Sequence, residues 1–272
     1  MKPLIGILQG RLTPSSGRGI QFFPKDNWEQ EFSDAREIGL GAIELLMRPK
    51  GLREHPLMTE AGRTRLREIR DTTHIAIPSV HGYYVPEDGY AKDLFDIVHA
   101  TADLGAKVIL VSFFHEKKLG ILPDATWKRA HELLAPAARH AAQLGITLGI
   151  EAELPAQTVL DFIMQSETPS AFGSYYDLGN QFACGFPVVD EIRLLNTKIA
   201  GVHIKDRLLN TDPNEESTSV PFGEGCADLP AALNALRDIG YRRPLILQGA
   251  RKEDGGELAL NAQYKKYIEE CL

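Results

Sequence analysis

Short apolar runs alternate with longer amphipathic segments along the whole chain. The runs are five to seven residues long and rich in Ile, Val and Leu, which is typical of strands buried in a parallel sheet. They cover residues 4–8, 42–46, 75–81, 107–113, 146–151, 172–177, 199–203 and 244–248. The pattern therefore predicts eight strands.

The segments that follow these runs have the apolar spacing of amphipathic helices. They cover residues 28–38, 60–72, 91–104, 124–144, 155–166, 188–195, 228–239 and 257–272. Glycine follows the last apolar position of four of them, at Gly39, Gly105, Gly145 and Gly240. Glycine there indicates the end of a helix, because it adopts the left-handed conformation without strain.

Strands that alternate with helices predict parallel βαβ units. Eight such units in 272 residues fit the size of a (β/α)8 barrel, the TIM barrel. A doubly wound sheet is the alternative, but it usually has a GxGxxG turn after the first strand, and the turn here is QGRLTPSSGRG. Since no low-complexity linker divides the chain, we expect one α/β domain over residues 1–272, a single (β/α)8 TIM barrel.

Composition and charge disfavour several classes of function. The chain is 43% hydrophobic and has a net charge of −7, so a large core is expected and a nucleic-acid partner is not. Cys184, Cys226 and Cys271 are far apart and odd in number, which favours a reducing compartment and a cytoplasmic protein. The start, MKPLIGILQGR, lacks a signal-peptide core, and no run approaches about 18 apolar residues, so we expect no membrane partner.

Polar side chains close or follow most of the predicted strands. The carboxyl ends of the strands carry the active site of a TIM barrel. The residues at these positions are Glu44, His81, His115, Glu151, Asp177, His203 and Gln248. The last four, two carboxylates, an imidazole and a carboxamide, could converge on one divalent cation in the mouth of the barrel.

Strand alternation adds two further candidates. Residues two apart on a strand point to the same side, so we expect Glu153 beside Glu151 and Lys205 beside His203. Glu153 could hold a substrate hydroxyl or act as a second acid–base group. Lys205 could stabilise an enolate oxygen or bind an anionic group of the substrate. Both could instead form salt bridges at the rim.

Other candidates for substrate binding also have structural alternatives. His81 could be a hydrogen-bonded core histidine, and Glu44 could pair with an arginine, although a carboxylate in an apolar run usually has a purpose. Arg11, after the first strand, could bind substrate or cap a loop, and His115 could be solvated. The glycines of PFGEG (221–225) could approach an anion or form only a turn.

Four segments carry a family resemblance: LGIEAEL, YYDLGNQFACG, VHIKDR and VPFGEGCADLPAALNALRDIGY. Together they resemble the sugar phosphate isomerase/epimerase group of the xylose isomerase-like barrels. VPFGEG before a helix is similar to what L-ribulose-5-phosphate 3-epimerases carry. The resemblance implies a carbohydrate substrate, one divalent ion (Mn²⁺, Mg²⁺, Co²⁺ or Zn²⁺) and a possible homo-oligomer.

The family pattern implies residue roles at the ends of strands five to eight. It places Glu, Asp, His and Glu there as metal ligands, and the two glutamates are also its acid–base pair. Carried over, this gives Glu151 as ligand and base, Asp177 and His203 as ligands, and Gln248 at the fourth position. Glutamine keeps an oxygen for the metal but cannot act as a base. A two-base epimerisation would need Glu153, or else His81 or Glu44, whereas isomerisation through a cis-enediol needs one base.

Three functions remain open at this point. We favour a metal-dependent sugar or sugar-phosphate isomerase/epimerase over a metal-dependent dehydratase or lyase of a polyol acid and over an inactive sugar-binding barrel. Endonuclease IV-type DNA repair enzymes share the superfamily, but they carry extra histidines after strands six and seven. The corresponding stretches here, LGNQFACG and RLLNTDPNEES, contain none, and the acidic charge disfavours a DNA groove.

Overall fold

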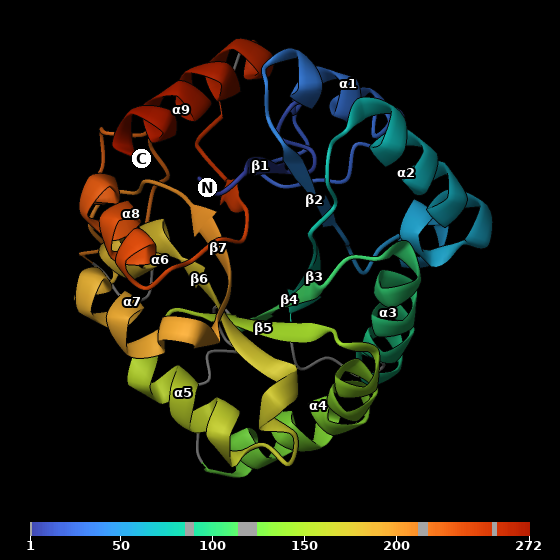
Figure 1. Cartoon of the computed structure of the whole chain (residues 1–272), viewed down its shortest axis with the longest axis vertical. Helices are drawn as coiled ribbons and strands as arrows, with labels where there is room; N and C mark the ends of the chain where they lie inside the picture. The colour runs from blue at the N-terminus through green and yellow to red at the C-terminus, as the bar shows by residue number, and fades with distance from the viewer. Residues whose placement is uncertain (1, 85–89, 114–123, 212–216, 252–254) are drawn as a thin grey trace.

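The computed structural model describes residues 2–84, 90–113, 124–211, 217–251 and 255–272. Within them, parallel strands form a closed barrel in which each strand pairs with the next in sequence and the last pairs with the first (Figure 1). The strands are β1 (Ile5–Leu8), β2 (Ala42–Leu46), β3 (Ser79–Tyr84), β4 (Val108–Phe113), β5 (Thr147–Ala152), β6 (Phe172–Asp177), β7 (Ile199–Ile204) and β8 (Leu245–Leu247). The predicted (β/α)8 barrel is confirmed.

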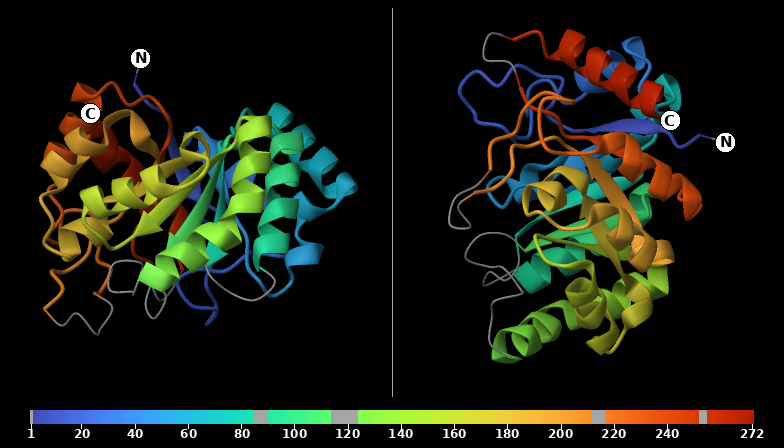
Figure 2. Two further views of the ribbon diagram at one scale, coloured as in Figure 1. Left: turned by 90° about the horizontal axis from the view of Figure 1, so that it is seen from below. Right: turned by 90° about the vertical axis from the view of Figure 1, so that its left-hand side faces the viewer.

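Helices surround the barrel on its outer side (Figures 1 and 2). In the described residues they are α1 (Gln30–Glu37), α2 (Glu60–Thr73), α3 (Tyr90–Leu104), α4 (Asp124–Leu144), α5 (Ala156–Gln165), α6 (Leu178–Ala183), α7 (Val188–Leu195), α8 (Leu229–Asp238) and α9 (Glu257–Cys271). Short 3-10 turns are η1 (Leu52–Glu54), η2 (Pro56–Met58), η4 (Pro169–Ala171) and η5 (Asn196–Lys198). None of the described helices has the length and apolar character to span a membrane.

The four glycines predicted to end helices do so. Each has a positive φ angle: 72° at Gly39, 91° at Gly105, 65° at Gly145 and 74° at Gly240. A residue with a Cβ would be strained in this conformation. The helix–strand connections at these points therefore follow directly from the sequence.

Two features differ from the predicted elements. β3 begins at Ser79 rather than at residue 75, because Pro78 has no N–H to donate to the ladder. α6 was not predicted; it is only six residues long and begins directly after β6, with Asp177 as its N-cap. A helix this short shows no repeated apolar period, so the pattern contained no signal for it.

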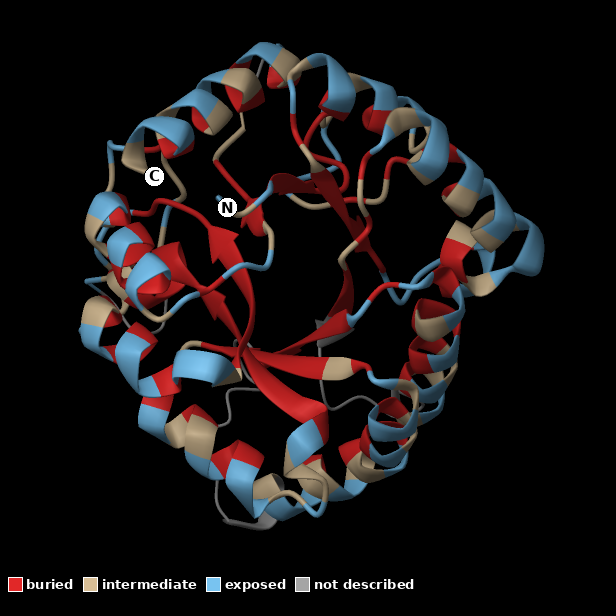
Figure 3. Ribbon diagram, viewed as in Figure 1, coloured by how far each residue is buried: buried red, intermediate tan, exposed pale blue. Residues whose placement is uncertain are grey.

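The main apolar core lies between the strands and the helices. Outward-facing strand residues such as Ile7, Ile43, Ile109 and Val202 have no exposed surface. Figure 3 shows this arrangement, with buried strands inside and helices exposed on their outer faces. Burial of side chains of this size contributes roughly 1.5–3 kcal/mol each. This layer holds the strands rigidly, and the strand ends carry the site.

One aromatic ring crosses the interior of the barrel. Tyr175 on β6 lies between Gly149 on β5 and Gly201 on β7, and a Cβ on Gly201 would lie only 2.4 Å from the ring. The two glycines leave the room that the ring occupies. As a result the Tyr175 hydroxyl reaches Glu44 on β2, 131 residues away in sequence.

Candidate metal and substrate site

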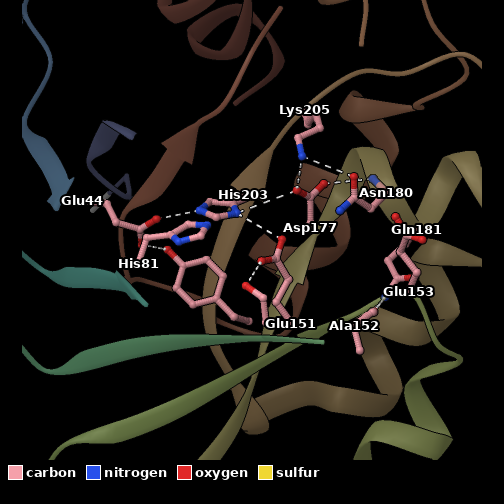
Figure 4. A network of polar contacts seen from close by, with 12 residues as sticks. Glu44, His81, Glu151, Ala152, Glu153, Asp177, Asn180, Gln181, His203 and Lys205 are labelled. Atoms are coloured by element: carbon pink, nitrogen blue, oxygen red, sulfur yellow. Dashed lines mark hydrogen bonds and ion pairs between the residues drawn. The ribbon is translucent and has the colours of Figure 1, made fainter. Parts of the chain in front are cut away.

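The carboxyl ends of β5, β6 and β7 bring three predicted ligands together inside the barrel (Figure 4). One ligand atom each of Glu151, Asp177 and His203 lie within 4.8 Å of one another, and all three residues are buried. His203 Nδ1 is 3.5 Å from Glu151 Oε1 and 3.8 Å from Asp177 Oδ2. Two carboxylates and an imidazole so arranged form a donor set suited to a divalent cation.

Among the described residues, three buried atoms of the predicted ligands have no hydrogen-bond partner: Asp177 Oδ2, which is ion-paired with Lys205, and His203 Nδ1 and Gln248 Oε1. A buried polar group without a partner costs about 1–3 kcal/mol. Asp177 Oδ2 and His203 Nδ1 are 3.8 Å apart, so one cation would contact both once the proton has left Nδ1. Gln248 follows β8 directly, and its backbone N–H donates to Ile204 O at the end of β7, 2.9 Å away. The residues present therefore fit a divalent metal ion.

Neighbouring groups hold one oxygen of each carboxylate and leave the other directed at His203. Ser112, which pairs with Glu151 across β4 and β5, donates its hydroxyl to Glu151 Oε2 at 3.3 Å. Asp177 Oδ1 accepts a hydrogen bond from Asn180 N at 2.9 Å, because Asp177 is the N-cap of α6. The carboxylates are thus preorganised by the fold.

Glu44 lies beneath this cluster rather than in the open mouth. Its Oε1 is 2.7 Å from His203 Nε2, and Oε2 accepts hydrogen bonds from Ser79 Oγ at 2.6 Å and from the Tyr175 hydroxyl. The Glu44 side chain has no exposed surface. A carboxylate at Nε2 places a proton on that nitrogen, so Nδ1 is left for a ligand.

Charges within the cluster shift the pKa values of its side chains. Burial opposes the charged form of Glu44, but the His203 and His81 imidazoles outweigh it, and the pKa of Glu44 is lowered. Burial also opposes the imidazolium of His203, yet the Glu44 and Glu151 carboxylates raise its pKa to about 10. For Asp177, burial is outweighed by Lys205 and His203, which lower its pKa. The Asp177 carboxyl is therefore ionised at neutral pH, as a ligand must be. The metal-free His203 ring is protonated at that pH, so a metal ion would have to displace the proton from Nδ1.

His81 stacks on His203 at the edge of the cluster, with 5.8 Å between ring centroids. Its Nδ1 is 2.6 Å from Gly82 O, so this nitrogen carries the proton and Nε2 is left as an acceptor. Burial lowers the pKa of His81, which keeps the ring neutral. The residue is buried, with 8% of its surface exposed.

Lys205 lies next to Asp177 (Figure 4). Its Nζ is 3.0 Å from Asp177 Oδ2, as an ion pair without hydrogen-bond geometry, and it donates to Asn180 Oδ1 at 3.3 Å. Asn180 also accepts from Arg207 Nη1 at 2.8 Å. Neither Asn180 nor Arg207 was predicted as a site residue. The sequence signal for Asn180 is its position, since it is a polar residue three places after the aspartate that ends β6.

Glu153 turns away from Glu151. It lies beyond the end of β5, on the side of Asn180 (Figure 4), with one carboxylate oxygen 3.8 Å from Arg207 Nη1. The expectation that alternation places both glutamates on one face assumed that β5 continues to Glu153, whereas the strand ends at Ala152. Its acid–base role remains a prediction, and its surroundings are those of an ion-paired carboxylate.

Arg11 is buried beside the end of β8. Its Nη1 donates to Gly249 O at 2.7 Å, while Nε and Nη2 have no hydrogen-bond partner in the described part of the chain. Burial lowers the pKa of Arg11 to about 9, with Arg251 acting in the same direction. Buried Glu31, which sequence analysis missed, holds the loop by accepting hydrogen bonds from the amides of residues 10, 12 and 13.

The glycines of PFGEG approach an anion that belongs to the chain itself. Gly223 N and Gly225 N donate to Asp206 Oδ2 at 2.9 and 3.0 Å, and Ala227 N donates to Oδ1 at 3.1 Å. Asp206 thereby fastens this loop beside Lys205. His115, another predicted site residue, lies outside the described residues.

Comparison with known proteins defines the class. The model of the xylose isomerase-like TIM barrel family matches residues 32–269, so the chain belongs to this family. It is 24% identical to a putative L-ribulose-5-phosphate 3-epimerase, SgbU of Haemophilus influenzae, over 90% of this chain and 92% of that protein.

Solved structures show the same fold. A xylose isomerase domain protein from Planctomyces limnophilus superposes with a TM-score of 0.78 at 17% identity, covering 100% of this chain and 98% of the other. The IOLI protein, solved with a binding zinc atom, gives a TM-score of 0.74 at 18% identity, with 98% and 97% covered. At these identities the likeness concerns the barrel alone.

Proposed function

We propose that this protein is a metal-dependent sugar or sugar-phosphate isomerase/epimerase. The observation that carries the proposal is the buried cluster of Glu151, Asp177 and His203, whose ligand atoms lie within 4.8 Å of one another. Membership of the xylose isomerase-like family supports it, as does the full-length similarity to a putative L-ribulose-5-phosphate 3-epimerase.

Glu151, Asp177, His203 and the Gln248 carbonyl oxygen would hold the ion. When bound, a divalent ion supplies Lewis acidity toward a carbonyl group and stabilises negative charge on its oxygen. Glu151 then acts as general base and removes the proton on the carbon next to that carbonyl. Its Oε2 is held by Ser112, so the carboxylate is fixed in place for a proton transfer.

Position 248 favours a reaction in which one side chain moves the proton. Gln248 can bind but cannot accept a proton near neutral pH. Glu151 can remove a proton from one carbon and return it to the neighbouring carbon on the same face of the enediol, which interconverts an aldose and a ketose. Epimerisation needs a proton acceptor on one face and a proton donor on the other. His81, neutral and with Nε2 as an acceptor, would serve as the acceptor only with a protonated Glu151 as the donor.

The remaining predicted residues position the substrate. His81 Nε2 accepts a hydrogen bond from a substrate hydroxyl. Lys205 holds Asp177 and presents its ammonium group to an oxygen of the substrate; its side chain is 10% exposed. Arg11 keeps two unpartnered donors near the end of β8 for an anionic group. Glu44 does not contact the substrate in this proposal, because it is fully buried beneath His203.

Deuterium exchange tests the proposal most directly. We would incubate the Mn²⁺-supplemented protein with L-ribulose 5-phosphate in D₂O and follow C1, C3 and the products by NMR. We expect deuterium next to the carbonyl and an isobaric product, with a loss on the order of 10²–10⁴-fold for Glu151→Gln. Glu153→Gln is the matched control, since Glu153 pairs with Arg207, and it should retain most of the exchange.

Two outcomes would contradict the proposal. Full deuterium exchange and turnover by Glu151→Gln would show that Glu151 is not the general base. A product lighter by one water would instead identify a dehydratase, and metal titration of the same variants would show whether the cluster still binds the ion.

A further inference from the structure

A second cavity lies at the opposite end of the barrel from the proposed catalytic cluster. It has a volume of about 420 Å³ and opens where the strands begin; its lining includes Ser79, Val108, Thr147, Ala200 and Ile246 from β3, β4, β5, β7 and β8. Cavities of roughly 300–1,000 Å³ are the usual size for small-molecule sites. We call it the strand-start cavity.

A local irregularity of β7 makes the space. Ser174 pairs with Ile199 and Tyr175 pairs with Gly201, so Ala200 is an extra residue in the ladder. Both Ala200 and Gly201 line the cavity, and neither has a side chain large enough to fill it. Protein interiors are normally closely packed, and bulges are common where a strand is reshaped beside a site.

The deep part of the cavity is apolar. The Tyr175 ring, Val108 and Ile246 form its walls. Three of the lining hydroxyls are already engaged: Ser79 Oγ and the Tyr175 hydroxyl donate to Glu44, and the Tyr241 hydroxyl donates to Pro244 O. The part of a ligand that lies deepest in the cavity would therefore contact aromatic and aliphatic surface and needs no polar groups.

The mouth of the cavity is cationic. Lys107 and Arg243 line it and are exposed, and Arg243 Nη1 is tethered to Ala200 O at 3.2 Å. None of the described residues that line the cavity is acidic, although the chain as a whole carries a net charge of −7. Two cations above an apolar pocket complement a ligand with one apolar and one anionic end.

We propose that the strand-start cavity binds a small aromatic carboxylate, with its ring against Tyr175 and its carboxylate at Arg243 and Lys107. The site is separate from the proposed catalytic cluster, which lies at the other ends of the same strands. The Tyr175 ring is the wall between them, since its hydroxyl bonds Glu44.

The test compares benzoate with benzamide, a neutral molecule of nearly the same shape. We expect calorimetry to detect benzoate binding to the wild-type protein at millimolar concentration. The double variant Lys107→Gln/Arg243→Gln should weaken benzoate binding about tenfold or more and leave benzamide within about twofold. The control Arg193→Gln/Lys266→Gln removes two exposed charges elsewhere and should change neither.

Two further measurements locate the ligand. Ala200→Leu should fill the cavity and abolish binding of both molecules, and if this variant fails to fold, the charge variants still decide. In crystals soaked with 4-bromobenzoate, we expect the anomalous bromine peak beside the Tyr175 ring. No benzoate binding, unchanged binding by the double variant, or a bromine peak only at the Glu151 cluster would each overturn the proposal.

Discussion

His203 Nε2 and Glu44 Oε1 lie 2.7 Å apart at the centre of the barrel, between side chains that are both fully buried. The two residues are 159 positions apart in sequence, on β7 and β2. Their contact fixes the tautomer of His203 and directs Nδ1 toward Glu151 and Asp177. Glu44 would therefore act on a bound metal ion through the histidine and not by touching the ion.

Replacing Glu44 by glutamine should weaken metal binding without removing any proposed ligand. Glutamine can present either an oxygen or an NH₂ group to Nε2, so the imidazole loses both the negative partner and its fixed orientation. Loss of such a partner typically costs 10–100-fold in metal affinity. Titration of the chelator-treated protein with Mn²⁺ and Zn²⁺ by calorimetry measures the effect.

The control for this variant is Glu54→Gln, because Glu54 is exposed and, among the described residues, forms an ion pair with Lys25 alone. Its metal affinity should equal that of the wild type. Equal affinity for Glu44→Gln as well would show that the hydrogen bond to Nε2 does not tune the site.

Restoring glutamate at position 248 should tighten the metal site. Gln248 Oε1 is buried and has no hydrogen-bond partner among the residues that the structure describes, and Gln248→Glu would add a third carboxylate to Glu151 and Asp177. We expect metal affinity to rise on the order of tenfold or more, because the cation gains a full charge at the ligand. The metal-free variant should melt at a lower temperature, since a third buried carboxylate then lacks compensation.

Melting curves with and without EDTA, together with calorimetric titration, test this prediction. Gln165→Glu, on the exposed surface of α5, is the matched control for the added charge. If Gln248→Glu left both the affinity and the metal-free melting temperature unchanged, position 248 would not face the ion.

The fold could be predicted from the sequence because local signals agree with one another. Apolar runs of strand length alternate with helical segments, and Gly39 and Gly105 end helices with the positive φ angles that only glycine adopts easily. The placement of Glu151, Asp177 and His203 followed from barrel geometry, because the carboxyl ends of parallel strands meet at one face.

The rest of the site depends on contacts that cross the barrel. The function of Glu44 is set by His203 and Tyr175, and nothing within the segment AIELL indicates these partners. Glu153 was expected beside Glu151, but alternation applies only while the strand continues. Asn180 gains its contacts from the short helix α6, whose sequence carries no period.

Buried His55 should make the protein less stable in acid. Its Nδ1 accepts a hydrogen bond from Leu57 N at 3.1 Å, and burial lowers its pKa to about 3. The unfolded chain takes up a proton near pH 6.5 while the native ring stays neutral, so stability falls as pH decreases from about 6.5 toward 3. At about 1.36 kcal/mol per pH unit, this single residue contributes roughly 2 kcal/mol of loss by pH 5.

His55→Asn removes that term while keeping a capping oxygen for the turn. Urea unfolding at pH 7 and pH 5 should show a decrease in the free energy of unfolding that is smaller by about 2 kcal/mol in His55→Asn than in the wild type. His74→Asn is the control, because His74 is exposed in a left-handed conformation that Asn tolerates. Equal pH dependence in all three proteins would refute the assignment.

Asp206 should control the loop that ends in PFGEG. Its buried carboxylate accepts hydrogen bonds from the amides of Gly223 and Gly225, and a Cβ on Gly225 would lie 2.1 Å from Oδ1. Asp206→Asn keeps the size but turns an NH₂ group toward amide donors, so we expect a loss of about 2–4 kcal/mol in stability.

Hydrogen exchange should accelerate at Gly223 and Gly225 more than at Ile150 in β5, whereas Asp238→Asn, an exposed change, should alter neither. Equal acceleration at all three amides would mean that Asp206 supports the whole barrel rather than this loop.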